Sequence, residues 1–282
     1  MSQSLLIGAA AGTRPPRRAW RFPVAGLRRL ASSLLLLLLW EAGSRAGVIP
    51  PRMIAAPSAI LASAWDLTVT GELPANLLVS LARVAAGFAI GATVGVALAV
   101  VAGLSRLGED VVDAPMQMLR TLPFLALVPL FILWFGIGEV PKVALVALGA
   151  TFPVYLNLFA GIRGVDPKLI EAARVFGLSG LSLVRRVVLP GALPSLLVGL
   201  RYALGVSWLS LVVAEQINAT AGIGHLINDA RDFLRTDIIV VGLLVYALLG
   251  LAADALVRWA ERRALRWRPA VVRGAGARGA AP

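Results

Sequence analysis

The sequence contains apolar runs that are long enough to cross a lipid bilayer. The clearest run covers residues 77–104 and reads LLVSLARVAAGFAIGATVGVALAVVAGL. A spanning helix needs about 20 mostly apolar residues, and it satisfies every backbone polar group internally. Over the whole chain 59% of residues are hydrophobic and 15% are charged, whereas a water-soluble domain carries more charge. The sequence therefore predicts an all-α integral membrane protein.

Hydropathy predicts about six transmembrane helices. They cover residues 27–45, 77–104, 121–137, 140–162, 189–214 and 236–257. Residues 105–120 are read as a loop. Residues 46–75 are read as a longer outer loop with a short amphipathic helix, for which Ser58 is the predicted N-cap.

Basic residues set the predicted orientation, because loops rich in Lys and Arg stay on the cytoplasmic side. The N-terminal tail, residues 1–26, holds arginines and no acid, and the tail 258–282 holds seven arginines against one acid. With six spans both termini are predicted to be cytoplasmic. The first dozen and the last ten residues are expected to be disordered. The net charge of +12 is thus a topology signal with some attraction to anionic lipids, and no nucleic-acid partner is predicted.

Several chemistries are excluded by missing residues. The chain has no cysteine and a single histidine, so disulfides, thiol catalysis and cysteine metal sites are excluded. It has no P-loop and no catalytic Ser, His or carboxylate motif. We predict no catalytic residue, cofactor or metal on this chain.

Small and charged residues inside the apolar spans stand out. Gly87, Gly91 and Gly95 fall on one helix face, a spacing that lets another helix approach closely. Arg83 and Arg201 lie within apolar spans and are candidates for a translocation pathway, because charge inside a membrane is costly. Arg83 lies near its helix end, where snorkelling to the interface explains it equally well.

The segment between the fourth and fifth spans is polar and amphipathic. Asp166 can cap a helix that starts at Pro167 and stops at Gly177, where a left-handed residue is needed. A second short helix is predicted near 179–188. Ile170, Ala173 and Phe176, with Leu169 flanking them, are predicted to form one apolar face. Periodicity alone favours an amphipathic loop resting on the membrane over a mechanical coupling element.

A known motif changes that balance. The spacing E-A-A, three residues, G, nine residues, a β-branched aliphatic residue, one residue and L-P resembles the EAA motif of ABC-importer permeases. It is filled by Glu171, Ala172, Ala173, Gly177, Val187, Leu189 and Pro190. Stretches such as LRTLPFLALVPLFILWFGIGEVPKV and AGIGHLINDARDFLRTD are similar to the nitrate/sulfonate/taurine branch, over roughly residues 50–268. Two departures are Val187, where isoleucine is more usual, and Asn76, where relatives often carry histidine.

The resemblance implies a type I ABC-importer permease fold, with the permease core at 76–257, in the bacterial cytoplasmic (inner) membrane. The partners it implies are a second permease (a homodimer or a heterodimer with a similar chain), two ABC ATPase subunits that bind ATP and Mg, and a periplasmic or lipid-anchored solute-binding protein. The implied solute is a small anion such as an alkanesulfonate, taurine or nitrate; a pyrimidine-type thiamine precursor is the alternative. The coupling helices are expected at 165–188. The residues expected to couple to the ATPase are Glu171, Ala172, Ala173, Arg174, Phe176, Gly177, Leu189 and Pro190.

A self-sufficient secondary transporter or channel is the rival interpretation. Such proteins are often built from inverted repeats with broken helices, and no convincing repeat relates the two halves of this sequence. A membrane scaffold without transport is a weaker alternative, which the motif spacing makes improbable.

Overall fold

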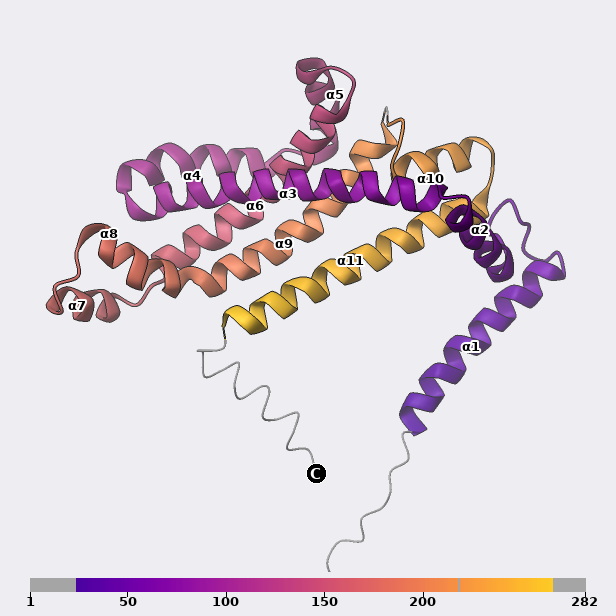
Figure 1. Ribbon diagram of the computed structural model, residues 1–282, viewed down its shortest axis with the longest axis horizontal. Helices are drawn as coiled ribbons and strands as arrows, with labels where there is room; N and C mark the ends of the chain where they lie inside the picture. The colour runs from indigo at the N-terminus through magenta and orange to yellow at the C-terminus, as the bar shows by residue number, and fades with distance from the viewer. Residues whose placement is uncertain (1–23, 218, 266–282) are drawn as a thin grey trace, which may run out of the picture.

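The computed structural model describes residues 24–217 and 219–265, and every regular element among them is a helix (Figure 1). The disorder expected of the first dozen and last ten residues lies outside this part of the chain. Four long helices form a bundle: α3 (Glu72–Leu104), α6 (Glu139–Arg163), α9 (Leu189–Gln216) and α11 (Thr236–Ala264). Helix α6 packs along both α3 and α9, so the main core lies among these three helices.

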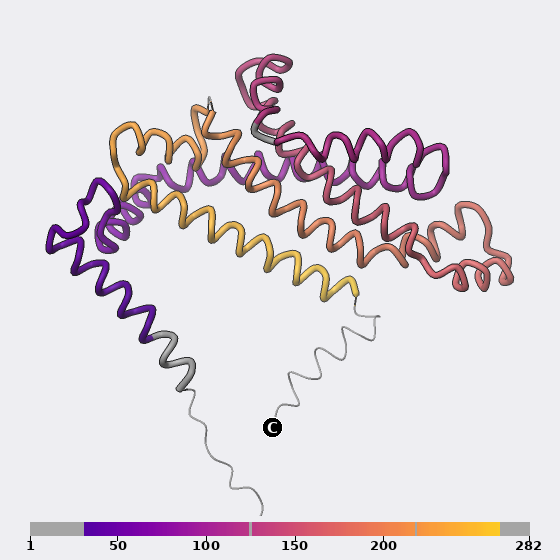
Figure 2. The backbone as a smooth tube through the Cα atoms, turned by 180° about the vertical axis from the view of Figure 1, so that it is seen from behind, coloured from indigo at the N-terminus to yellow at the C-terminus, as the bar shows by residue number. Residues whose placement is uncertain are grey.

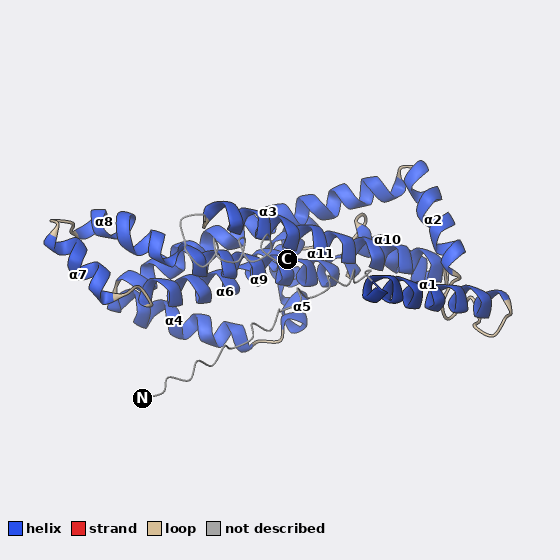
Figure 3. Ribbon diagram, turned by 90° about the horizontal axis from the view of Figure 1, so that it is seen from below, coloured by secondary structure: helices blue, strands red, loops and turns tan. Residues whose placement is uncertain are grey.

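The two ends of the bundle carry different short helices. At one end lie α7 (Pro167–Val175), α8 (Gly180–Leu183) and the π-helix η1 (Val184–Val188); we call this the α7 end. At the other, the α10 end, lie α2 (Pro57–Val69) and α10 (Ile223–Asp232) (Figures 1 and 3).

Helix α1 (Val24–Arg45) meets α2 near its C-terminal end and otherwise runs apart from the bundle (Figure 2). Its leucines at 34–39 are exposed. A helix with an uncovered leucine surface suits contact with lipid tails or with another membrane helix.

The three glycines of α3 all face α6. A Cβ atom on Gly87 would lie 2.6 Å from the Val146 side chain, and one on Gly95 would lie 2.7 Å from the Thr151 carbonyl oxygen. A Cβ atom on Gly91 would collide with the Ala147 carbonyl oxygen. The backbones of α3 and α6 therefore approach as closely as small residues allow.

The region after α3 differs from the sequence prediction. Residues 105–120, predicted to be a loop, form most of α4 (Arg106–Thr121), where Ser105 accepts a hydrogen bond from Gly108 N and caps the helix. The predicted span 121–137 is not one continuous helix, since α5 (Phe124–Phe135) is a short helix bent by 115° from α4. Leu122 is extended and Pro123 follows it, and a residue before proline disfavours helix.

In the described residues, four helices are long and apolar enough to cross a membrane, or up to five if the bent α4–α5 pair is one span. Six spans and cytoplasmic termini remain predictions. The four helices are α3, α6, the continuous helical segment from Gly180 to Gln216, and α11.

Two helix boundaries also differ. Ser58 is not the cap of α2: Pro57 starts the helix, and the Ser58 amide and hydroxyl donate to Glu41 at 3.0 and 2.7 Å. Helix α11 runs on to Ala264, past the predicted end at 257. Its last turns are rich in Ala, Arg and Glu, which are good helix formers.

Candidate functional site

The segment that carries the E-A-A spacing folds as predicted at its two ends. Asp166 caps α7 by accepting a hydrogen bond from Lys168 N at 2.9 Å. Gly177 has a φ of 81°. The amides of Gly177 and Leu178 donate to the carbonyl oxygens of Arg174 and Ala173 at 2.9 and 3.0 Å. This is the Schellman pattern, which needs a left-handed residue at the position of Gly177.

The predicted apolar face of α7 is wrong in part. Ala173 is buried and Ile170 packs against the main core, whereas Phe176 is 86% exposed. The reason is that α7 ends at Val175, so Phe176 belongs to the cap and leaves the helical face.

In α7, its cap and α8, four large apolar side chains are instead exposed, and we call them the α7 surface: Leu169, Val175, Phe176 and Leu181. Glu171, Ala172 and Arg174 are exposed beside them. An exposed apolar patch with a polar rim is typical of a surface that binds another protein.

The α7 surface is attached firmly to the long helices. Ile170 of α7 packs against one buried cluster. The cluster contains Ile162 of α6, Val165 of the connection to α7, Val188 of η1 and Ala192 of α9. Leu189 and Pro190 form the first turn of α9, which continues from α8 and η1 without a break. Because packed interiors deform little, a force on α7 would be transmitted to α6 and α9.

At the α10 end, Arg83 is almost fully buried and doubly paired. Its Nε and Nη2 donate to Glu139 at 2.5 and 2.6 Å, and its Nη1 donates to Glu215 at 2.7 Å. Nη1 also donates to the Ala221 carbonyl oxygen at 2.6 Å. Arg83 therefore does not snorkel, and in this conformation its charge is not open to a solute.

Glu215, which directly follows the predicted fifth span, is the centre of this network. Its carboxylate accepts from Ser80 Oγ at 2.7 Å, from Gly224 N at 2.9 Å and from Tyr246 Oη at 3.0 Å. The network thus joins α3, α9, α10 and α11, and Glu139 adds α6.

The chain between α9 and α10 closes over the network. Gly222 has a φ of 114°, and a Cβ atom there would lie 2.6 Å from Arg83 Nη1. Its amide donates to Asn76 Oδ1 at 2.7 Å, which gives Asn76 a structural role. Sequence reasoning missed Glu139, although an arginine in an apolar span signals that acids at neighbouring span ends are its partners.

Arg201 faces α11. Its Nη2 donates to Glu261 at 2.7 Å, and its Nε lies 3.6 Å from Asp254. Arg201 is neutralised by two acids, and the cavity it lines, between α9 and α11, also contains Asp254. This geometry does not favour Arg201 as an anion-binding residue.

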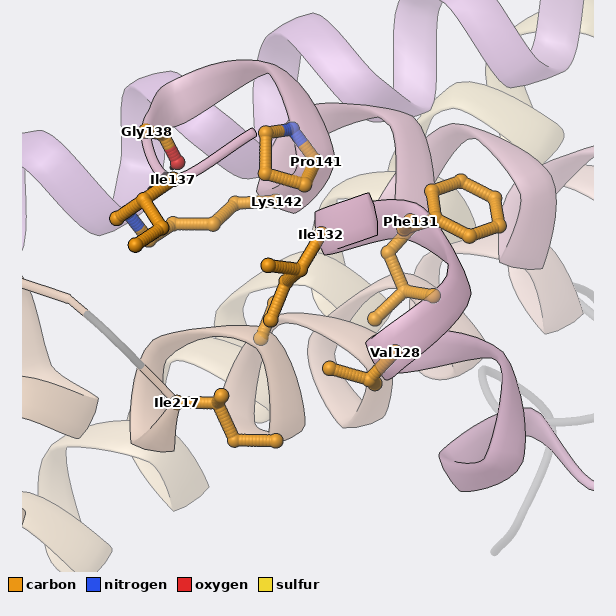
Figure 4. A pocket seen from close by; sticks show the side chains of 10 residues that line it. Val128, Phe131, Ile132, Ile137, Gly138, Pro141, Lys142 and Ile217 are labelled. Atoms are coloured by element: carbon orange, nitrogen blue, oxygen red, sulfur yellow. Dashed lines mark hydrogen bonds between the residues drawn. The ribbon is translucent and has the colours of Figure 1, made fainter. Parts of the chain in front are cut away.

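A small apolar pocket lies among α5, α6 and α9 near the α10 end. In Figure 4, Val128, Ile132 and Ile217 surround it, and Lys142 extends toward Gly138, to whose carbonyl oxygen its Nζ donates at 2.9 Å. Its volume of about 20 Å³ is close to that of one water molecule, so it is too small for a solute.

In the part of the chain that the structure covers, no group of three or more His, Asp or Glu side chains is placed to hold a metal ion.

Comparison with known proteins identifies the family of the chain. The family described as "binding-protein-dependent transport system inner membrane component" matches residues 75–266. An Escherichia coli (strain K12) protein named as an aliphatic sulfonates transport permease, SsuC, is 48% identical over 83% of this chain and 89% of its own length. The taurine transport system permease protein TauC of the same strain is 34% identical over 89% of this chain and 94% of its own.

The fold is also that of solved transporters. An amino acid ABC transporter chain matches with a TM-score of 0.57 at 22% identity, covering 70% of this chain and 96% of that one. An inward-facing structure of the MetNI methionine ABC transporter matches with a TM-score of 0.52 at 22% identity, and the match covers 64% of this chain and 91% of that one. The chain is a transport component rather than an enzyme: it belongs to the family of binding-protein-dependent transport system inner membrane components, as the permease component of an ABC importer.

Proposed function

We propose that this permease forms the pathway by which a bacterial importer takes up a small organic anion, an aliphatic sulfonate in the first instance. The similar proteins of E. coli and Bacillus subtilis, at 48% and 43% identity, carry names that refer to aliphatic sulfonates. TauC is named for taurine, and CmpB of Synechococcus elongatus, at 30% identity, is named for bicarbonate. Each of these solutes is small and carries an anionic group, and none of these names refers to a pyrimidine.

Coupling to ATP hydrolysis is proposed to run through the α7 surface. The observation that supports it is an uncovered apolar patch, led by Phe176, fixed by a capped helix to the ends of α6 and α9. An amphipathic helix that presents small residues such as Ala172 beside such a patch suits a groove on a partner protein. The partner is an ATPase subunit, which binds ATP and Mg.

This assignment puts the α7 end in the cytoplasm and the α10 end on the outer side of the inner membrane. Two permeases, identical or similar, enclose the pathway, and each receives one ATPase subunit. A solute-binding protein, periplasmic or lipid-anchored, delivers the anion at the α10 end. Closure of the ATPase pair then moves both α7 helices and changes which side of the pathway is open.

Reconstitution tests the proposal. The permease is placed in proteoliposomes with its partner ATPase and solute-binding protein from the same organism, and uptake of labelled alkanesulfonate, taurine, nitrate and bicarbonate is measured. We expect sulfonate uptake that requires ATP and both partners. Uptake by the permease alone, driven by an ion gradient, would instead establish a secondary transporter.

A further inference from the structure

A further cavity, much larger than the pocket in Figure 4, lies about midway along the bundle, between the α4–α5 bend, α6 and α9. Its volume is about 430 Å³, within the range of small-molecule sites. Residues from the middle of α6, such as Phe152, and from the middle of α9, such as Tyr202, line it. It is therefore at the depth where a crossing solute has to pass.

One positive charge faces this cavity without a counter-charge. Arg120 lines it from the last turn of α4, and no Asp or Glu is among the described residues of its wall. Within the described part of the chain Arg120 forms no ion pair, whereas Arg83 and Arg201 each meet two acids. An ionisable side chain at this depth indicates a functional site.

The rest of the wall is mainly apolar. Leu127, Phe152, Leu156 and Val206 line it, while Asn157 and Tyr202 add an amide and a hydroxyl. Asn157 Nδ2 donates to the Pro153 carbonyl oxygen at 2.8 Å, which fixes the amide and leaves its oxygen and second N–H for a ligand. A cation, two polar groups and an apolar wall suit a solute with an anionic head and a short alkyl part.

The break between α4 and α5 is an independent indication that this cavity contains water. Leu122 and Pro123, between α4 and α5, are not helical, and Leu122 lines the cavity. Non-helical backbone at membrane depth is tolerated only where protein buries it or where it lines a water-filled cavity.

We propose that this cavity is the solute site of the permease, with Arg120 binding the anionic head group and the apolar wall binding the alkyl part. The inference rests on the proposed function and adds a site and a specificity-determining residue to it. Arg120 ranks ahead of Arg83 and Arg201 because it alone of the three lacks an acidic partner.

Transport kinetics in proteoliposomes holding the complete complex are the first test. We expect Arg120→Gln to lower sulfonate kcat/KM at least tenfold, mainly through KM, and Arg120→Lys to retain part of the activity. Arg106→Gln, an exposed arginine at the start of the same helix, is the matched control and should transport normally. Sulfonate uptake by Arg120→Gln with unchanged KM would overturn the site while leaving the proposed function intact. Absence of ATP-driven sulfonate uptake in the unaltered complex would contradict the proposed function itself.

Thiol labelling gives a measurement that does not need transport. The chain has no cysteine, so Val206→Cys introduces a single thiol in the cavity wall. We expect this thiol to react with a water-soluble methanethiosulfonate that carries a sulfonate, and alkanesulfonate to slow the reaction. Leu211→Cys, on the same helix but fully buried, should stay unmodified. Equal rates for the two positions would overturn the cavity as an aqueous site.

Discussion

Arg83 on α3 and Glu215 on α9 are 132 residues apart in the sequence, and their side chains meet at 2.7 Å inside the protein. The side chain of Arg83 is 4% exposed and that of Glu215 is 0% exposed. Each is also held by other elements of the bundle. This pair and its partners fasten the α10 end of four long helices together.

Removing Glu215 should therefore destabilise the fold strongly. Glu215→Ala leaves Arg83 as a partly unpaired buried charge, a change that typically costs about 3–5 kcal/mol. Glu72→Ala, an exposed acid in the first turn of the same helix as Arg83, should cost less than about 1 kcal/mol. Equilibrium unfolding of the purified protein in detergent compares the two, and similar losses would contradict a structural role for the network.

The glycine spacing on α3 gives a second prediction. Gly91→Ala would push a methyl group into the backbone of α6 and should destabilise the protein by about 1–3 kcal/mol, as overpacking does. Gly205 on α9 lies in open space, where an added Cβ atom would meet no other atom within 4 Å. Gly205→Ala should be neutral or stabilising by up to about 1 kcal/mol. A stable Gly91→Ala protein in the same assay would show that α3 and α6 do not pack this closely.

The sequence could predict what depends on local patterns. Long apolar runs located the main helices, and the cap at Asp166 and the turn at Gly177 follow from residue type. Helix α4 could not be predicted from hydropathy, because its acidic residues make the segment as polar as a loop. One of these acids has a partner distant in sequence, since the Tyr155 hydroxyl donates to Asp113 at 2.9 Å.

The same limit applies to the candidate site. That an arginine lies in an apolar span is visible in the sequence, but whether it is paired depends on residues far along the chain. Arg83 forms an ion pair with Glu215, and Arg201 forms one with Glu261. Arg120 gives no such signal, because it lies in a segment that hydropathy reads as a loop.

A third prediction separates Arg201 from the transport site. Its ion pairs with Asp254 and Glu261 are partly exposed, and such pairs contribute about 0–1 kcal/mol. Arg201→Gln should therefore unfold at nearly the same denaturant concentration as the unaltered protein, and its KM for sulfonate uptake should not change. If the KM of Arg201→Gln rose as far as that of Arg120→Gln, Arg201 would be shown to line the pathway.

A fourth prediction concerns coupling through α7. Ala172 is exposed, so Ala172→Asp should leave folding and membrane insertion intact while placing a charge where the ATPase binds. We expect uptake to fall at least tenfold relative to ATP hydrolysis in proteoliposomes. Gly177→Leu should act similarly, because a φ of 81° strains any residue with a side chain. Normal uptake per ATP in both variants would show that α7 does not transmit the force.

The affinity of the permease for its ATPase tests the proposed coupling most directly. Phe176 and Phe233 are matched aromatic residues at opposite ends of the bundle, 86% and 80% exposed, so neither Phe176→Ser nor Phe233→Ser should unfold the protein. An aromatic anchor at the centre of an interface contributes about 2 kcal/mol or more, which is more than tenfold in Kd. With the ATPase added to the permease in detergent, we predict that Phe176→Ser weakens binding at least tenfold and that Phe233→Ser leaves it unchanged. Equal, unaltered affinities for both variants would contradict the α7 surface as the ATPase-binding site.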